Sequence, residues 1–67
     1  MIIFGTTFKE LRLLNNKSQK DMAKILNISQ SAVSNWEAGR KIPEVPMLIT
    51  IAKHFEVTTD YLLGLEN

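Results

Sequence analysis

The sequence predicts an all-α fold: a compact five-helix bundle that forms a single domain over residues 1–67. Apolar residues recur at helical spacing in five segments, and no segment shows the alternation of a half-buried strand. Residues that typically begin or end helices stand between those segments. The chain has two prolines, three glycines and no cysteine. Its stability must therefore come from helix packing, and not from disulfides or a cysteine-based metal site.

The first predicted helix runs from Thr7 to about Asn15. Its apolar residues recur at steps of three, and Arg12 stands beside this stripe. The members of the stripe are Phe8, Leu11 and Leu14. The adjacent Asn15 and Asn16 end the helix.

The second predicted helix spans residues 19–26. Ser18 stands three residues before Asp21, which makes a weaker relative of the capping box found at helix starts. The apolar residues available for burial are Met22, Ala23, Ile25 and Leu26. Asn27 then supplies a left-handed turn, because asparagine tolerates positive φ better than most residues.

The third predicted helix covers residues 30–38 and follows the second after very few residues. Ser29 caps its start, and Gly39 ends it. Val33 and Trp36 stand one turn apart and form its apolar side.

Two more helices follow a loop over residues 40–43. The apolar residues of the fourth helix keep a helical period: Leu48, Ile49, Ile51, Ala52 and Phe55. Thr58 or Thr59 caps a short fifth helix, and Gly64 closes it. The apolar residues of this last helix are Tyr61, Leu62 and Leu63.

The second and third helices have the spacing of a helix-turn-helix. Counting Gln19 as the first residue, the key positions five, nine, fifteen and eighteen are Ala23, Asn27, Val33 and Trp36. The fifth residue must be small so that the helices cross closely, and the ninth must accept a left-handed turn. The other two hold the second helix of the pair to the core. Many helical hairpins satisfy this pattern, so the spacing indicates a helix-turn-helix only in combination with other features of the sequence.

Charge is distributed unevenly along the chain. Residues 1–41 carry seven basic and three acidic side chains, giving +4, whereas residues 42–67 carry one basic and four acidic, giving −3. A basic end is a modest indication of a polyanionic partner, because lysine and arginine release counterions condensed on a phosphate backbone. The alternative is an ordinary solvated surface.

The helix order, the run ISQSAVSNWEAGRKIP at residues 28–43 and the ending VTTDYLLG resemble the lambda-repressor-like helix-turn-helix family. This family includes phage repressors, Cro proteins and XRE-type bacterial regulators. The resemblance covers the chain from about Phe4 to Leu65. It implies a five-helix bundle in which the helix at residues 30–38 lies in the major groove of DNA.

The same resemblance places a structural ion pair on Arg12 and Glu37, which links the first helix to the third. Asn27 departs from the glycine that many members carry, and we expect it to make the same turn. Ala38 stands where many members have an asparagine that touches phosphate. This second departure removes one expected contact with the DNA backbone.

The exposed face of the third helix carries amides and hydroxyls instead of lysine and glutamate. An amide offers a donor and an acceptor matched to the N6 and N7 edge of adenine, and a serine hydroxyl serves either role. The candidate base-reading residues, at neighbouring positions on the helix, are Gln30, Ser31, Ser34 and Asn35. The alternative is that the serines and Asn35 only solvate a short helix and that Gln30 belongs to its cap.

Candidate phosphate contacts lie mainly at helix ends, where free backbone N–H groups present the positive end of the helix dipole. They are Ser18, Gln19, Ser29, Trp36, Arg40 and Lys41. The alternatives are plain N-caps for the two serines and a solvated loop for the two cations. In relatives with tryptophan at the position of Trp36, the indole N–H donates to phosphate; core packing alone is the other interpretation.

These features predict a sequence-specific transcription regulator, most simply a repressor, that binds a palindromic operator in double-stranded DNA as a homodimer. Apolar residues near the C-terminus form a candidate dimer interface: Tyr61, Leu62, Leu63 and Leu65. Burial of these residues within the monomer is the alternative. A second class of function also stays open, a protein-interaction module such as an antitoxin or a regulator subunit.

Other functions are not expected. The sequence has no phosphate-cradling glycine loop and no nucleophile paired with a base, so we expect no enzyme. His54 is the single histidine, so we expect no metal, and nothing indicates a cofactor or a small-molecule ligand. The apolar start MIIF is too short for a signal peptide or a membrane span. We expect a soluble, cytoplasmic protein with no membrane partner.

Overall fold

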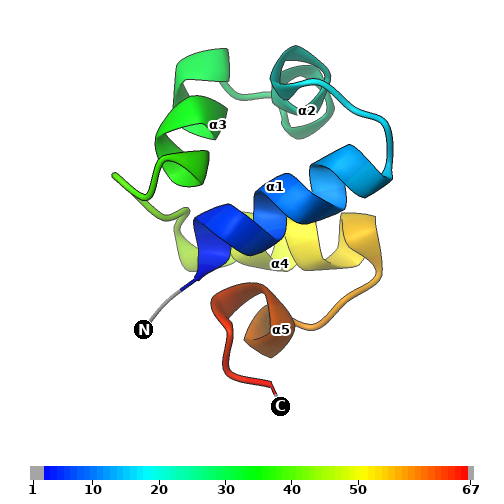
Figure 1. The fold of residues 1–67 in the computed structure, drawn as a ribbon, viewed down its shortest axis with the longest axis vertical. Coiled ribbons are helices and arrows are strands. Elements are labelled where there is room, and N and C mark those ends of the chain that lie inside the picture. Colours follow the sequence, from blue (N-terminus) through cyan, green and yellow to red (C-terminus); the bar gives the residue numbers. More distant parts are fainter. Residues whose placement is uncertain (1–2, 67) are drawn as a thin grey trace.

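Five helices make up most of residues 3–66, the part of the chain that the computed structural model describes. They are α1 (Phe4–Leu14), α2 (Gln19–Leu26), α3 (Gln30–Glu37), α4 (Val45–Phe55) and α5 (Thr59–Leu63). Helix α1 crosses the middle of the molecule, with α2 and α3 on one side and α5 on the other (Figure 1). The predicted all-α five-helix bundle is confirmed.

Helices α2 and α3 are joined by the sharp turn that the sequence predicts. Asn27 has φ 58° and ψ 47°, which is the left-handed conformation. The backbone N–H of Ile28 donates to the carbonyl of Ala23 at 2.9 Å, which closes the end of α2. The hydroxyl of Ser29 then accepts from the N–H of Ala32 at 3.1 Å and caps α3. These local contacts set the angle between the two helices.

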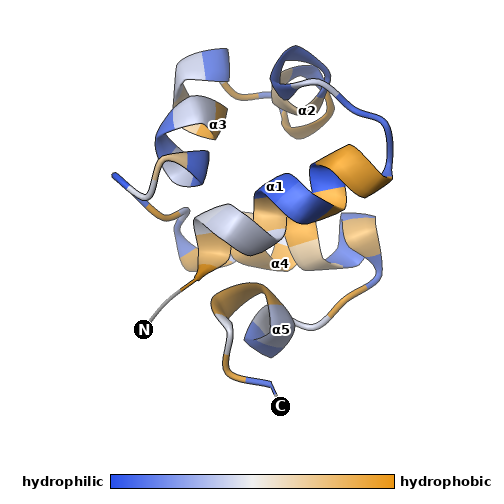
Figure 2. Ribbon diagram, in the orientation of Figure 1, coloured by the Kyte–Doolittle hydropathy of each residue, from blue (hydrophilic) through white to orange (hydrophobic). Residues whose placement is uncertain are grey.

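An aromatic cluster joins α1 to α3 at the centre of the core. The rings of Phe4 and Phe8 stack at 5.4 Å between centroids, and Trp36 meets them edge-on at 5.9 and 5.7 Å. Such edge-to-face pairs contribute roughly 0.5–1.5 kcal/mol beyond the area that they bury. Apolar residues colour much of the central helices α1 and α4, whereas the outer turns of α2 and α3 are hydrophilic (Figure 2).

The buried face of α1 differs from the expected one. The helix begins at Phe4, three residues before the predicted start, and Leu14 is 78% exposed. Residues in an α-helix advance by about 100° each, so a stripe with steps of three drifts by roughly 60° at every step. Phe4 and Phe8, four residues apart, stay closer together around the axis and take the core. Ile25 of α2 and Ile49 of α4, also expected inside, flank their buried faces and are exposed.

Gly5 brings the backbones of α1 and α3 into direct contact. A Cβ atom added to Gly5 would overlap the carbonyl oxygen of Trp36 and lie 3.2 Å from that of Glu37. Real Cβ atoms do not occupy such positions, so only glycine allows α1 to pass this close to the end of α3. The sequence gives no local sign of this requirement, because it depends on two segments about thirty residues apart.

The second half of the chain closes the bundle. Helix α4 has a proline in its first turn and ends at Glu56, which adopts φ 58° although it is not a glycine. Thr58 caps α5 through its hydroxyl, and Gly64 ends that helix with φ 77°. None of the helices within residues 3–66 has both the length and the apolar character needed to cross a bilayer.

Candidate nucleic-acid interface

The outer surface of α3 carries the four side chains predicted to read bases. Val33 and Trp36 are buried and turn one side of the helix toward the core. At about 100° per residue, the predicted reading residues spread over roughly 140° of the remaining circumference. Gln30 and Ser31 are exposed, and Ser34 and Asn35 are half-buried. The structure thus brings them together on one continuous, uncharged polar face.

Arg40 sits beside this face at the far end of α3. Gly39 takes φ 78°, and the backbone N–H of Arg40 returns to the carbonyl of Asn35 at 3.0 Å. The Nη1 atom of Arg40 also approaches Oδ1 of Asn35 at 3.5 Å, a long and weak contact between exposed groups. The chain reversal therefore places a cation next to the last of the predicted reading residues. Lys41 follows it and is exposed.

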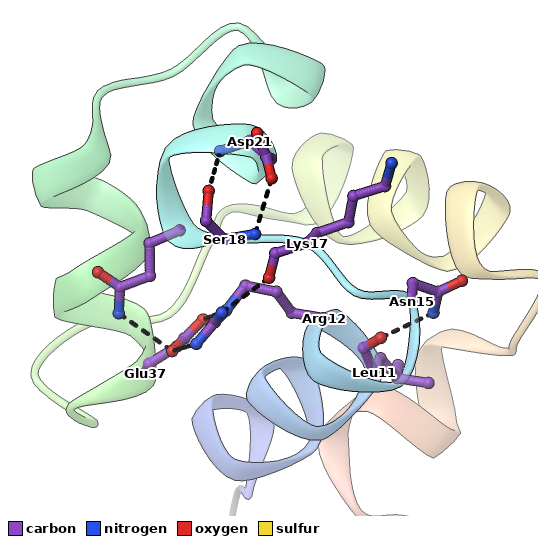
Figure 3. Close-up of polar contacts among 8 residues, drawn as sticks. Leu11, Arg12, Asn15, Lys17, Ser18, Asp21 and Glu37 are labelled. Carbon is purple, nitrogen blue, oxygen red and sulfur yellow. Dashed lines mark hydrogen bonds and ion pairs between the residues drawn. The ribbon is translucent and has the colours of Figure 1, made fainter.

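A buried ion pair supports α3 from behind. Arg12 donates through Nε to Oε2 of Glu37 at 2.7 Å and through Nη2 to Oε1 at 3.0 Å (Figure 3). The two side chains are only 9% and 5% exposed. The hydrogen bond to Glu37 raises the pKa of Arg12, desolvation opposes this, and the charge of Glu37 adds to the rise. The pair fixes the end of α3 to α1.

The same network reaches the start of α2. The third nitrogen of the Arg12 guanidinium group, Nη1, donates to the backbone carbonyl of Lys17 at 2.9 Å. Gln19 donates from Nε2 to Oε1 of Glu37 at 3.1 Å. One arginine and one glutamate therefore hold three helices in register. Gln19 is a predicted phosphate contact, and in the structure part of the donor capacity of its amide is used inside the protein.

The two serines predicted to contact phosphate both cap helices. Ser18 and Asp21 form a full capping box, since Oγ of Ser18 accepts from the Asp21 N–H at 3.0 Å. In return Oδ2 of Asp21 accepts from the Ser18 N–H at 2.9 Å. Ser29 caps α3 in the same way without a partner carboxylate. Each hydroxyl accepts in its cap, so its own proton is available to a phosphate oxygen, and phosphate contact stays a prediction.

Trp36 has a packing role in the structure. It is 7% exposed and lies against Phe4 and Phe8 in the aromatic cluster. Packing of the Trp36 ring in the core, which both interpretations include, is therefore observed. A phosphate contact by its indole N–H stays a prediction.

The predicted dimer surface needs one correction. Leu62 is 0% exposed and belongs to the core, so it cannot form part of an interface with a second molecule. A helix as short as α5 has a single inward position of this kind, and Leu62 occupies it. Leu63 is half-buried, whereas Tyr61 is 42% and Leu65 66% exposed. The surface available near the C-terminus is smaller than the sequence indicated.

Taken together, a helix pair with a tight turn and an uncharged reading face on its second helix defines a helix-turn-helix domain of the kind that binds DNA. A family model described as helix-turn-helix matches residues 8–62. The chain belongs to this helix-turn-helix family, of the XRE type that the sequence predicts. Because the family consists of regulators without enzymatic activity, the chain is not an enzyme.

Particular relatives are named as transcription regulators. The chain is 38% identical over 61 residues to the HTH-type transcriptional activator BcrR of Enterococcus faecalis. The aligned region covers 91% of this chain and 30% of BcrR. It is 37% identical over 60 residues to the HTH-type transcriptional regulator ImmR of Bacillus subtilis strain 168, covering 90% of this chain and 47% of ImmR. The chain thus spans less than half the length of both relatives.

A solved structure has the same fold. The crystal structure of a transcriptional regulator from Listeria innocua superposes with a TM-score of 0.92 over 100% of this chain and 63% of that one. The two sequences are 22% identical. At this identity the match shows the fold alone.

Proposed function

We propose that the chain binds double-stranded DNA sequence-specifically, with α3 in the major groove, and regulates transcription from a palindromic operator. The observation that carries this proposal is the uncharged face of α3. Its members, all exposed or half-buried, are Gln30, Ser31, Ser34 and Asn35. A helix face in contact with water gains nothing from avoiding charge, whereas base edges require paired donors and acceptors.

The amides supply the strongest discrimination. Gln30 and Asn35 each match the N6 and N7 edge of adenine, and a good bidentate pair contributes about 1–3 kcal/mol against a wrong base. Ser31 and Ser34 have short side chains that leave room for the helix to approach the groove floor. Arg40 and Lys41 lie where the phosphate backbone passes the end of α3, and they position the helix without reading sequence.

A homodimer accounts for a palindromic operator. Two copies of α3 about 34 Å apart would occupy major grooves one helical turn apart on the same side of the duplex. The exposed Tyr61 and Leu65, with half-buried Leu63 between them, form the candidate interface. Repression needs only that the operator is occupied, whereas activation needs a further contact with the transcription machinery. Repression is therefore the simpler function for this domain, although the relative BcrR is named as an activator.

Selection of bound sequences from a random duplex pool tests the proposal. We expect an enriched motif with two half-sites in inverted orientation and adenines among the positions read by the amides. The Gln30→Ala and Asn35→Ala variants serve as controls, and each should lose enrichment at its own position in the half-site. A pool without any enriched sequence would overturn the proposal and favour a protein-interaction module that has kept the fold.

A further inference from the structure

The turn that ends α3 brings Arg40 back onto Asn35. Gly39 adopts φ 78°, a left-handed conformation that favours glycine, and the backbone N–H of Arg40 then donates to the Asn35 carbonyl at 3.0 Å. The same reversal brings Nη1 of Arg40 to 3.5 Å from Oδ1 of Asn35. Two residues five positions apart are therefore joined through both their backbones and their side chains.

Arg40 has no carboxylate within salt-bridge distance among residues 3–66. The ion pair of this part of the chain joins Arg12 to Glu37. Both carboxylate oxygens of Glu37 accept from Arg12, and Oε1 also accepts from Gln19. A guanidinium has five N–H donors in a planar group. One of these donors faces Asn35, so the others remain for a phosphate.

A guanidinium decides which end of the Asn35 amide faces it. The two ends of an asparagine amide have nearly the same shape, but one is an acceptor and the other carries two donors. Arginine has donors only, so the amide oxygen is favoured on the side of Arg40. The flipped amide would direct N–H groups at N–H groups. Arg40 therefore restrains the orientation of the amide before DNA is bound.

A fixed amide orientation distinguishes adenine from guanine. The major-groove edge of adenine offers the N7 acceptor and the N6 donor, whereas guanine offers acceptors at both N7 and O6. An amide oxygen has two lone pairs, so Oδ1 of Asn35 can accept from Arg40 and from N6 of adenine together while Nδ2 donates to N7. Against guanine the same oxygen would meet O6, another acceptor. An amide that turns freely would present Nδ2 to guanine instead, so the restraint is what penalises guanine.

We propose that Arg40 is a positioning residue for base reading, which holds the Asn35 amide in the orientation that accepts adenine and rejects guanine. This inference rests on the proposed function, because it assumes that Asn35 faces a base in the major groove. The contact between the two side chains is long and exposed to water in the free protein. Once DNA covers it, the lower local dielectric strengthens the hydrogen bond. The remaining guanidinium donors bind the neighbouring phosphate, so one side chain links a phosphate contact to a base contact.

The ratio of affinities for two duplexes tests this role. One duplex is the selected operator, and the other has G·C in place of A·T, in both half-sites, at the position where Asn35→Ala loses enrichment. Arg40→Met removes every donor of the side chain and keeps much of its length. It should lower the adenine-to-guanine affinity ratio about threefold or more, which is the size of coupling found between residues in contact. Fluorescence anisotropy on the two duplexes measures the ratio.

Lys41→Met is the matched control, because it removes the neighbouring exposed cation. It should weaken binding to both duplexes by the same factor and leave the ratio unchanged. In the Asn35→Ala background, Arg40→Met should not change the ratio either, since no amide remains to be oriented. Thermal melting by circular dichroism verifies that every variant is folded.

Equal loss of affinity on both duplexes in Arg40→Met would show that Arg40 contacts phosphate alone. That result would overturn the positioning role and leave the proposed function intact. The role also fails if Arg40→Met lowers the ratio as much in the Asn35→Ala background, or if the position lost in Asn35→Ala is not an adenine. A parent protein that enriches no sequence would instead defeat the proposed function, and the positioning role with it.

Discussion

Arg12 is the residue on which the position of α3 depends most. Its guanidinium is nearly buried and shares a bidentate contact with Glu37. Removing one member of a buried pair leaves the other charge without compensation, which costs about 3–5 kcal/mol. We expect Arg12→Met to lower the free energy of unfolding in urea by about this amount, enough to unfold much of a small domain.

A double variant separates charge burial from packing. Arg12→Met combined with Glu37→Leu removes both charges, and apolar replacement of a buried pair is often neutral or stabilising. The double variant should therefore recover most of the stability lost in the single one. A single variant that melts at the parent's temperature would show that the pair contributes nothing to the fold.

Substitution of Asn35 should distinguish base-specific contacts from the sequence-independent contacts with phosphate. Its amide lies on the outer face of α3 beside Arg40. We expect Asn35→Ala to weaken binding to the selected operator by about 1–3 kcal/mol and to change binding to random duplex much less. Fluorescence anisotropy on the two duplexes at one salt concentration measures the difference. An equal loss on both would show that Asn35 reads no base.

Asp21 makes the stability of α2 depend on pH. The hydrogen bond that the backbone N–H of Ser18 donates to the Asp21 carboxylate lowers the pKa of Asp21 below the ordinary 3.8, and the Ser18 side chain and, to a smaller extent, Lys17 and Lys24 lower it further. A lowered folded-state pKa means that the charged form stabilises the fold above pH 3.8 and that this contribution is lost as pH falls through the folded pKa. The Asp21→Asn variant should therefore be less stable than the parent at neutral pH.

The difference between parent and Asp21→Asn should shrink as the solution is acidified, when urea unfolding is followed at several pH values. Ser18→Ala provides a comparison, because it removes the hydroxyl cap, at a cost of roughly 1 kcal/mol, but keeps the backbone N–H that is the main cause of the lowered Asp21 pKa, so its difference from the parent should change less with pH. A difference that is constant across the pH series would mean that the carboxylate charge does not act through the capping box.

At the scale of whole elements, the close packing of α1 against α3 fixes the distance between these two helices. Their contact depends on Gly5, where a Cβ would overlap the Trp36 carbonyl. Alanine normally favours a helix over glycine by about 1 kcal/mol, but overpacking costs about 1–3 kcal/mol. We expect Gly5→Ala to give a net loss of stability, measured by thermal melting, and to weaken operator binding because α3 is displaced.

Thr6→Ala is the matched control for this element. Thr6 is the next residue of α1 and is exposed. Its replacement should leave both the melting temperature and operator binding close to those of the parent. If Gly5→Ala were as stable as Thr6→Ala, α1 and α3 would have room to spare and the close approach would not matter.

The bounds of helices were more predictable than their buried faces. Ser18, Ser29 and Thr58 cap the helices that follow them, and α2 begins and ends at the expected residues. Caps act through neighbours in the chain, so a short stretch of sequence contains the whole cause. Burial depends on partners elsewhere in the chain, so helical spacing alone predicts Leu14 inside and does not predict that Phe4 belongs to the helix.

At the scale of the whole molecule, the exposed apolar surface near the C-terminus should decide how two copies share an operator. Leu65 is 66% exposed and lies just after α5. If it belongs to the dimer contact, Leu65→Asp should lower affinity for the full palindrome at least about tenfold, a coupling of roughly 1.4 kcal/mol. Affinity for a duplex with one half-site should not change.

Leu14→Asp is the control for the dimer contact, since Leu14 is 78% exposed and lies on α1. It should bind the full palindrome as the parent does. Sedimentation of the protein–DNA complexes counts the copies bound. One copy of the parent on a full palindrome, or equal affinities for Leu65→Asp and the parent, would argue against a dimer at this surface.

The sequence by itself determined the helix order, the capped ends, the turn at Asn27 and the uncharged outer face of α3. Each of these follows from residue type and from neighbours a few positions away. The tertiary structure decided that Leu62 is buried while Leu65 is not, and that Gly5 must be a glycine. It also showed that the Arg12 guanidinium donates hydrogen bonds to the Lys17 carbonyl as well as to Glu37. These outcomes depend on how segments far apart in the chain fill one small core, which no local pattern contains.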